Sequence, residues 1–149
     1  MMIKWTITKH TKEKCIEDIK NLDEDAKWLV EIKKHNRSEM QNRTCFMWYR
    51  EISKLGKTDE TATDIRGHCK LHFGVPILRE DNDDFRKDYD DIVRPLSYEN
   101  KLKIMVDPLD LPVTRIMSVD QMQKYMEEVQ KYGYSFGIQL TIPNEGEML

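Results

Sequence analysis

Residues 36–56 read NRSEMQNRTCFMWYREISKLG, and this stretch predicts an amphipathic helix between a serine and a glycine. Ser38 and Gln41 have the spacing of a capping box, in which the serine hydroxyl accepts a hydrogen bond from the third helical N–H and the glutamine reaches back. Gly56 is typical of a residue that follows a helix end. The apolar residues in between recur with helical spacing, so we expect them to form the buried stripe. They are Cys45, Trp48, Tyr49, Ile52 and Leu55.

The start of this predicted helix is rich in cations and side-chain amides. Residues 33–43 hold four Lys or Arg and a single acid, Glu39. Guanidinium groups, amides and the free N–H groups of a helix N-terminus are the donors that hold phosphate oxygens. The candidate DNA-binding residues are therefore Lys33, Lys34, Arg37, Gln41, Asn42 and Arg43.

The same residues also fit a structural interpretation without a ligand. A helix cap explains Ser38 and Gln41 fully. The arginines would then be exposed, or would pair with the acids of residues 80–91, where seven acidic residues face two basic ones. Such a charge run predicts a solvated loop, a polar helix face or a hinge. Both interpretations stay open at this point.

Alternating apolar residues predict strands near both ends of the chain. We expect strands at residues 3–7, 28–32 and 138–142, and a further one at residues 101–106. A short helix that begins after Thr11 would connect the first two. This opening β-α-β unit and the C-terminal strand would form a small sheet.

Two more helices are predicted between these strands. One opens at Asp59 or Thr61 and runs to Phe73, where Gly74 would end it. The other runs over residues 119–132, after a second capping box formed by Ser118 and Gln121. The sequence therefore predicts one α+β domain over residues 1–149, with a small sheet, three to four helices and an acidic insert or hinge at about residues 79–112.

Charge and cysteine content narrow the class of protein. The net charge is −3, but residues 1–79 hold 16 Lys and Arg against 12 Asp and Glu, whereas residues 80–149 hold 8 against 15. This balance disfavours a histone-like coating of DNA and permits a local basic groove. The three cysteines are widely spaced and odd in number, which indicates reduced thiols. Without an apolar run of membrane length or a typical signal peptide, we expect a protein of the cytoplasm with no membrane contact.

The sequence offers few signals for catalysis. It has no glycine-rich phosphate loop, so neither ATP nor a dinucleotide is expected, and no other cofactor is predicted. His68 and His72 are spaced as two metal ligands on one helix face could be, and Asp83, Asp84 and Asp88 could hold a divalent ion. These residues support an alternative function, a metal-dependent nuclease acting on recombination intermediates. A third hypothesis is an interaction protein whose residues 80–91 mimic nucleic acid in a host protein's basic groove.

The chain resembles the NinB (Orf) family of lambda-type phage recombination mediators. The resemblance rests first on the predicted opening strand–helix–strand, which runs into the pattern N-R-S-x-x-Q-N-R at residues 36–43 and an aromatic-rich helix. It also includes the predicted helix at about residues 59–73. The third part is residues 114–133, where Met117-Ser118-Val119 leads into an amphipathic helix and a glycine. Together these parts cover about two thirds of the chain.

The resemblance implies a protein without catalytic activity of its own. Members of the family bind single-stranded DNA with little sequence preference, contact the host single-strand binding protein and help a RecA-type recombinase to load. They form intertwined dimers that enclose a channel, so a homodimer is expected. By this resemblance Arg37, Gln41, Asn42 and Arg43 would lie near the DNA path or the dimer seam. Lys33 and Lys34 would add phosphate contacts.

Overall fold

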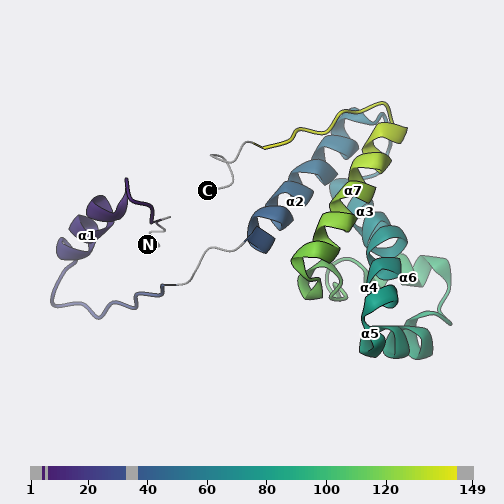
Figure 1. Cartoon of the computed structure of the whole chain (residues 1–149), viewed down its shortest axis with the longest axis horizontal. Coiled ribbons are helices and arrows are strands. Elements are labelled where there is room, and N and C mark those ends of the chain that lie inside the picture. Colours follow the sequence, from purple (N-terminus) through teal and green to yellow (C-terminus); the bar gives the residue numbers. More distant parts are fainter. Residues whose placement is uncertain (1–4, 6, 33–36, 144–149) are drawn as a thin grey trace. The chain divides into compact units, whose positions relative to one another are not determined.

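The computed structural model describes Trp5, residues 7–32 and residues 37–143, with only the backbone for residues 37–39. These residues form two compact units, one on each side of the gap at residues 33–36, and each unit is described by itself (Figure 1). The first unit contains α1 (Lys12–Lys20). The second contains α2 (Arg37–Leu55), α3 (Ala62–Cys69), η1 (Lys70–Gly74), α4 (Val75–Asp81), α5 (Asp83–Asp88), η2 (Tyr89–Val93), α6 (Tyr98–Ile104), η3 (Thr114–Ile116) and α7 (Val119–Ser135).

The predicted α+β fold is wrong for the part of the chain that the structure describes. That part is helical and contains no β-strand, so the small sheet expected from the N-terminal β-α-β unit and a C-terminal strand does not form there. Residues 3, 4 and 6 of the first predicted strand lie outside the described residues. Residues 28–32 are extended but belong to no ladder, and the side chains of Trp28, Val30 and Ile32 are exposed.

Two hydrogen bonds of the N-terminal unit involve tryptophan side chains. The indole N–H of Trp5 donates to Asp18 Oδ2 at 2.7 Å, and that of Trp28 donates to the carbonyl oxygen of Asp23 at 2.8 Å. Helix α1 matches the predicted helix, and Thr11 precedes it. Helix α1 is short, and Cys15 is its one buried side chain. It therefore offers the alternating apolar side chains of residues 28–32 no apolar surface to pack against within this unit. Alternation shows which side chains share a face, but it does not supply a partner strand.

The predicted strand at residues 101–106 is a helix instead. Ser97 begins α6, because its hydroxyl accepts a hydrogen bond from the N–H of Asn100 at 3.2 Å. Helix α6 packs against α3 at Gly67, where an added Cβ would lie 3.0 Å from Val106. A local cap and a close helix contact therefore outweigh the strand-like apolar run.

The predicted C-terminal strand is extended and packs against helices. Ile138 and Leu140 are buried and Gln139 and Thr141 are exposed, as the alternation predicts, but Ile142 is 68% exposed. Its backbone partners are side chains of α2: the indole of Trp48 donates to the carbonyl oxygen of Thr141 at 2.6 Å, and the Thr141 N–H donates to Glu51 at 3.0 Å. The segment thus serves as a cover over α2 and α7 and not as part of a sheet.

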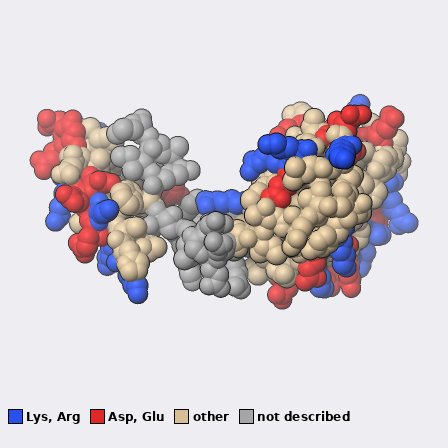
Figure 2. All heavy atoms as spheres, turned by 90° about the horizontal axis from the view of Figure 1, so that it is seen from above, with Lys and Arg blue, Asp and Glu red and all other residues tan. Residues whose placement is uncertain are grey.

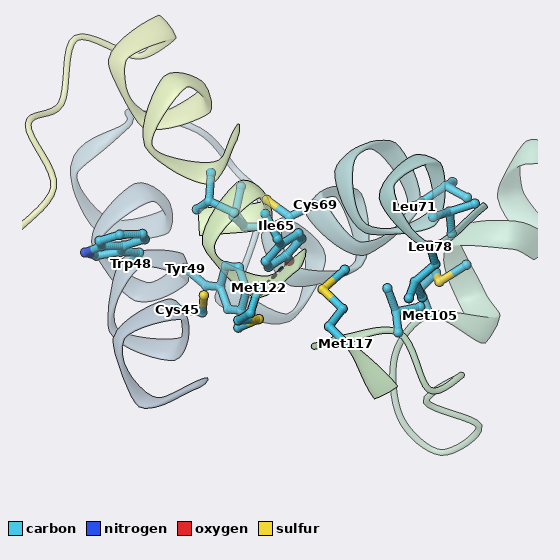
Figure 3. Close-up of a cluster of buried hydrophobic side chains, with 14 of the residues drawn as sticks. Cys45, Trp48, Tyr49, Ile65, Cys69, Leu71, Leu78, Met105, Met117 and Met122 are labelled. Atoms are coloured by element: carbon cyan, nitrogen blue, oxygen red, sulfur yellow. Dashed lines mark hydrogen bonds between the residues drawn. The ribbon is translucent and has the colours of Figure 1, made fainter. Parts of the chain in front are cut away.

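Helices α2, α3 and α7 enclose the core of the second unit (Figures 1 and 3). Figure 3 shows side chains from these helices converging on a common interior. At its centre the hydroxyl groups of Tyr49 and Tyr125 share a hydrogen bond of 2.5 Å. Burial raises the pKa of both phenols well above the ordinary value. The buried stripe predicted for α2 is confirmed for Cys45, Trp48, Tyr49 and Ile52, whereas Leu55 is exposed.

Of the three glycines expected to end helices, only Gly56 does so, because it directly follows the last residue of α2. The helical path continues through Gly74 from η1 into α4. An added Cβ at Gly74 would lie 2.5 Å from Val113, so close packing favours glycine there.

Gly133 lies inside α7, and Leu140 occupies the space above it. Helix α7 ends at Ser135, and Gly137, whose φ is +76°, follows two residues later. The N–H of Ile138 is bonded to the carbonyl of Gly133. This is the Schellman arrangement, which favours glycine.

Of the two predicted capping boxes, the one at α7 is confirmed and the one at α2 is not. Both bonds of the capping box predicted for Ser118 and Gln121 are present, so the start of α7 is confirmed. Helix α2 begins one residue earlier than predicted, at Arg37. The side-chain oxygen of Gln41 is buried without a hydrogen-bond partner among the described residues, so it does not reach back to Ser38.

The acidic segment is mostly helical, as α5 and η2 with the end of α4, and so matches the polar helix face expected for it. Arg79 binds both carboxylate oxygens of Asp90 at 2.9 Å. Among the described residues, no helix combines the length and the apolar character needed to cross a bilayer.

Candidate functional site

The structure separates the predicted DNA-binding residues. Lys33 and Lys34 lie outside the described residues, as does the side chain of Arg37. Arg43 is exposed on α2 and makes no hydrogen bond or ion pair with another described residue. Gln41 is buried, with 5% of its surface exposed, and so cannot reach a ligand from its position in the core. Asn42 alone lines a pocket.

This pocket has a volume of about 200 Å³ and lies between α2, the α3–η1 segment and the loop before η3. A pocket of this size is smaller than the clefts of about 300–1,000 Å³ that hold drug-sized ligands, so it suits one small group. We call it the Lys70 pocket. Its lining residues are Asn42, Phe46, Arg66, Lys70, Asp110, Leu111, Pro112, Val113, Thr114 and Arg115.

Lys70 forms the buried part of the pocket. Only 1% of its surface is exposed, and its ammonium donates to the carbonyl oxygen of Met105 at 2.6 Å and to Asp110 Oδ1 at 2.7 Å. Burial lowers the pKa of Lys70, while its hydrogen bond to Asp110 acts in the opposite direction. These two contacts fix the loop that follows α6.

Arg66 shares the same carboxylate oxygen. Its guanidinium lies 2.9 Å from Asp110 Oδ1 and 5.3 Å from the centre of the Phe46 ring. Burial raises the pKa of Asp110, but the hydrogen bonds from Lys70 and Arg66 outweigh it, so the pKa is lowered overall. Asp110 also has a φ of +45°, in the left-handed region that Asp and Asn tolerate better than other side chains.

The pocket therefore has more positive than negative charge. Arg66, Lys70 and Arg115 contribute three cations, and Asp110 is the one carboxylate among the lining residues. Two of these cations meet at a single oxygen atom, while Arg115 is exposed. A low-dielectric pocket with a surplus of cations attracts an anion, and the amide of Asn42 adds a neutral donor.

Sequence reasoning identified only Asn42 of these residues. Arg66 and Lys70 lie four residues apart, so they share one helix face, and Lys70 directly follows the buried Cys69. A lysine on the buried side of a helix is a signal that could have indicated a charged pocket. Asp110 and Arg115 carry no comparable local signal, because their contacts span about 40 residues or more of sequence.

The two metal-binding hypotheses find no ligand cluster. Within the described ranges, no three His, Cys, Asp or Glu side chains are grouped so that they could hold a metal ion. The His68 and His72 rings stack on each other with centroids 4.2 Å apart. Asp83 pairs with Arg86 at 2.6 Å.

The face of the second unit that Figure 2 shows carries no large basic region. A broad uncharged area lies at its centre, and Lys and Arg as well as Asp and Glu lie around the edge. Any attraction of an anionic ligand must therefore be local. Comparisons with family models, with curated proteins and with solved structures find no match for this chain.

Proposed function

We propose that this chain is a phage recombination mediator that binds single-stranded DNA without sequence preference. It assists the loading of a RecA-type recombinase on strands coated by the host single-strand binding protein, and it has no catalytic activity of its own. In this proposal it acts as a homodimer. The proposal combines the family resemblance of residues 36–43 with the chemistry of the Lys70 pocket.

One observation carries the proposal. Asn42 belongs to the N-R-S-x-x-Q-N-R pattern, and its side chain lines a pocket with the three cations Arg66, Lys70 and Arg115. A phosphate oxygen in this pocket would meet charged donors and a neutral amide. Phe46, 47% exposed at the same pocket, offers a ring on which an unpaired base could stack.

The exposed face of α2 extends the DNA path in this proposal. Arg43 is exposed one residue after Asn42, and its charge is free to neutralise a phosphate. Arg37, Lys33 and Lys34 would contribute further phosphate contacts ahead of it. Gln41 is buried, so we assign it a structural part in α2 instead of DNA contact.

The test compares the wild type with Arg37→Ala/Arg43→Ala in binding to fluorescent oligo-dT, oligo-dA and duplex DNA. We expect the wild type to prefer single strands, and the double variant to lose affinity for both single strands by a similar factor, because phosphate contacts carry no sequence information. Arg94→Ala/Lys131→Ala is the control, since it removes the same charge from two exposed side chains elsewhere.

Equal affinity of the wild type and the Arg37/Arg43 variant for oligo-dT would contradict the proposed DNA path. An equal loss in the control variant would show that only net charge matters. Light scattering of the full chain measures its mass, and a monomer at all concentrations would contradict the dimer.

A further inference from the structure

The Lys70 pocket has a charge that does not match an internal DNA phosphate. Its lining holds three cations and one carboxylate, a formal balance of +2. An internal phosphodiester carries a single negative charge, whereas a phosphate monoester carries about −1.5 to −2 at neutral pH. The monoester is therefore the better electrostatic match.

The shape of the pocket leads to the same choice. It has a volume of about 200 Å³, and the ammonium of Lys70, 1% exposed, lies beneath its surface. An internal phosphate has chain on both sides, and both must leave this small pocket. A terminal phosphate has chain on one side only, so it can reach the guanidinium of Arg66 with less bending of the strand.

Asp110 makes the pocket responsive to such a ligand. Its Oδ1 atom forms ion pairs with both Lys70 and Arg66, as a phosphate oxygen could do. A dianion entering beside it would share the guanidinium of Arg66 and would also meet Arg115, which is exposed and forms no ion pair with a described residue. Phe46 lies at the same pocket, where the base of the terminal nucleotide could stack.

We propose that the Lys70 pocket binds the terminal phosphate monoester of a DNA strand, so that the protein prefers phosphorylated strand ends. The inference rests on the proposed single-strand function and adds end recognition to it. Arg115, Asn42 and Arg66 contact the phosphate, and Lys70 adds its charge from beneath the pocket.

The experiment measures the affinity of the full chain for oligo-dT of about 16 nucleotides, the upper end of known single-strand site sizes. Three forms are compared at one salt concentration: a 5′-phosphate, a 3′-phosphate and hydroxyl groups at both ends. We expect one phosphorylated form to bind about tenfold more tightly than the hydroxyl form, as charge-assisted hydrogen bonds allow. Comparison of the 5′-phosphate form with the 3′-phosphate form identifies which end of the strand is recognised.

Two variants locate the effect. Arg115→Gln should nearly abolish the preference for the phosphorylated end. Arg94 is exposed and lies outside the pocket, so Arg94→Gln should leave the preference unchanged. Asp110→Asn should strengthen binding of the phosphorylated form, because it removes the competing carboxylate. Asn also tolerates the positive φ at this position. A circular dichroism melt checks that each variant is folded.

Equal affinity for all three forms, with single-strand binding intact, would overturn end recognition and leave the proposed function standing. A preference that Arg115→Gln leaves unchanged would also overturn the assignment to this pocket. Absence of binding to every oligonucleotide would overturn the proposed function, and end recognition with it.

Discussion

Lys70 shows how one buried side chain can determine a site. An ammonium with 1% of its surface exposed is stable only if its donors find acceptors, and Met105 and Asp110 supply them. Because Asp110 also pairs with Arg66, one carboxylate balances two buried or half-buried cations. The charge surplus of the pocket thus follows from the residues that fold the loop.

The protonation of a single side chain, His68, is predicted to affect the stability of the fold. Its ring stacks between His72 and Tyr132, with centroids 4.2 and 4.6 Å away. Burial, and then the nearby His72, lower the pKa of His68 below the ordinary value of about 6.5. The folded state therefore binds this proton less tightly than the unfolded state, and protonation favours unfolding.

The stabilisation from neutral His68 is complete above the ordinary histidine pKa and is lost as the pH falls from that value through the lowered pKa of the folded state. We expect the unfolding temperature to drop between about pH 8 and pH 5.5, and His68→Phe, which keeps a ring in the stack, to reduce this drop. Calorimetry at both pH values measures it. His10→Phe, an exposed histidine of the N-terminal unit, should keep the full drop. The same drop in the His68 variant would contradict the prediction.

At the scale of elements, local signals were predictable and distant ones were not. The capping box of Ser118 and Gln121 is contained in four residues, and it is present as predicted. The alternation at residues 138–142 correctly identified Ile138 and Leu140 as inward side chains, but it could not show that helix α2, not a strand, supplies their neighbours. Gly74 and Gly133 looked like helix ends because close packing against residues far along the chain leaves no local pattern.

Gly74 links the packing of helices to the geometry of the pocket. An added Cβ would lie 2.5 Å from Val113, a stiff β-branched side chain that is 1% exposed and lines the pocket. Alanine is favoured over glycine in a helix by about 1 kcal/mol. Overpacking costs about 1–3 kcal/mol, and a buried valine between fixed neighbours cannot move easily.

We therefore expect Gly74→Ala to lower the free energy of unfolding by up to about 2 kcal/mol in urea titrations, because the gain in helix propensity offsets part of the overpacking cost. Val113→Ala should also destabilise the protein, by opening a cavity. The double variant should be more stable than the sum of the two losses predicts, because Val113→Ala removes the clash. Strict additivity of the two changes would show that the contact between Gly74 and Val113 does not limit the packing.

At the scale of the whole molecule, charge distribution limits how DNA can bind. The chain has a net charge of −3, and the visible face of the second unit has a broad uncharged area with side chains of both signs around it (Figure 2). Such a surface does not attract DNA over long distances. Binding must depend on a few close phosphate contacts, which the pocket and the arginines of α2 would provide.

The number of these contacts sets the salt dependence of binding. For single strands the logarithm of the affinity falls with the logarithm of salt concentration by about 0.7 per neutralised phosphate, so about three contacts predict a slope near −2. Anisotropy titrations of oligo-dT across a salt series measure the slope, and Arg43→Ala should make it shallower by about 0.7. Arg94→Ala, at an exposed position away from the pocket, should leave it unchanged. A slope steeper than about −5 would require a broad basic surface, which the visible face of this unit does not offer, and would place the DNA on residues other than those of the pocket and α2.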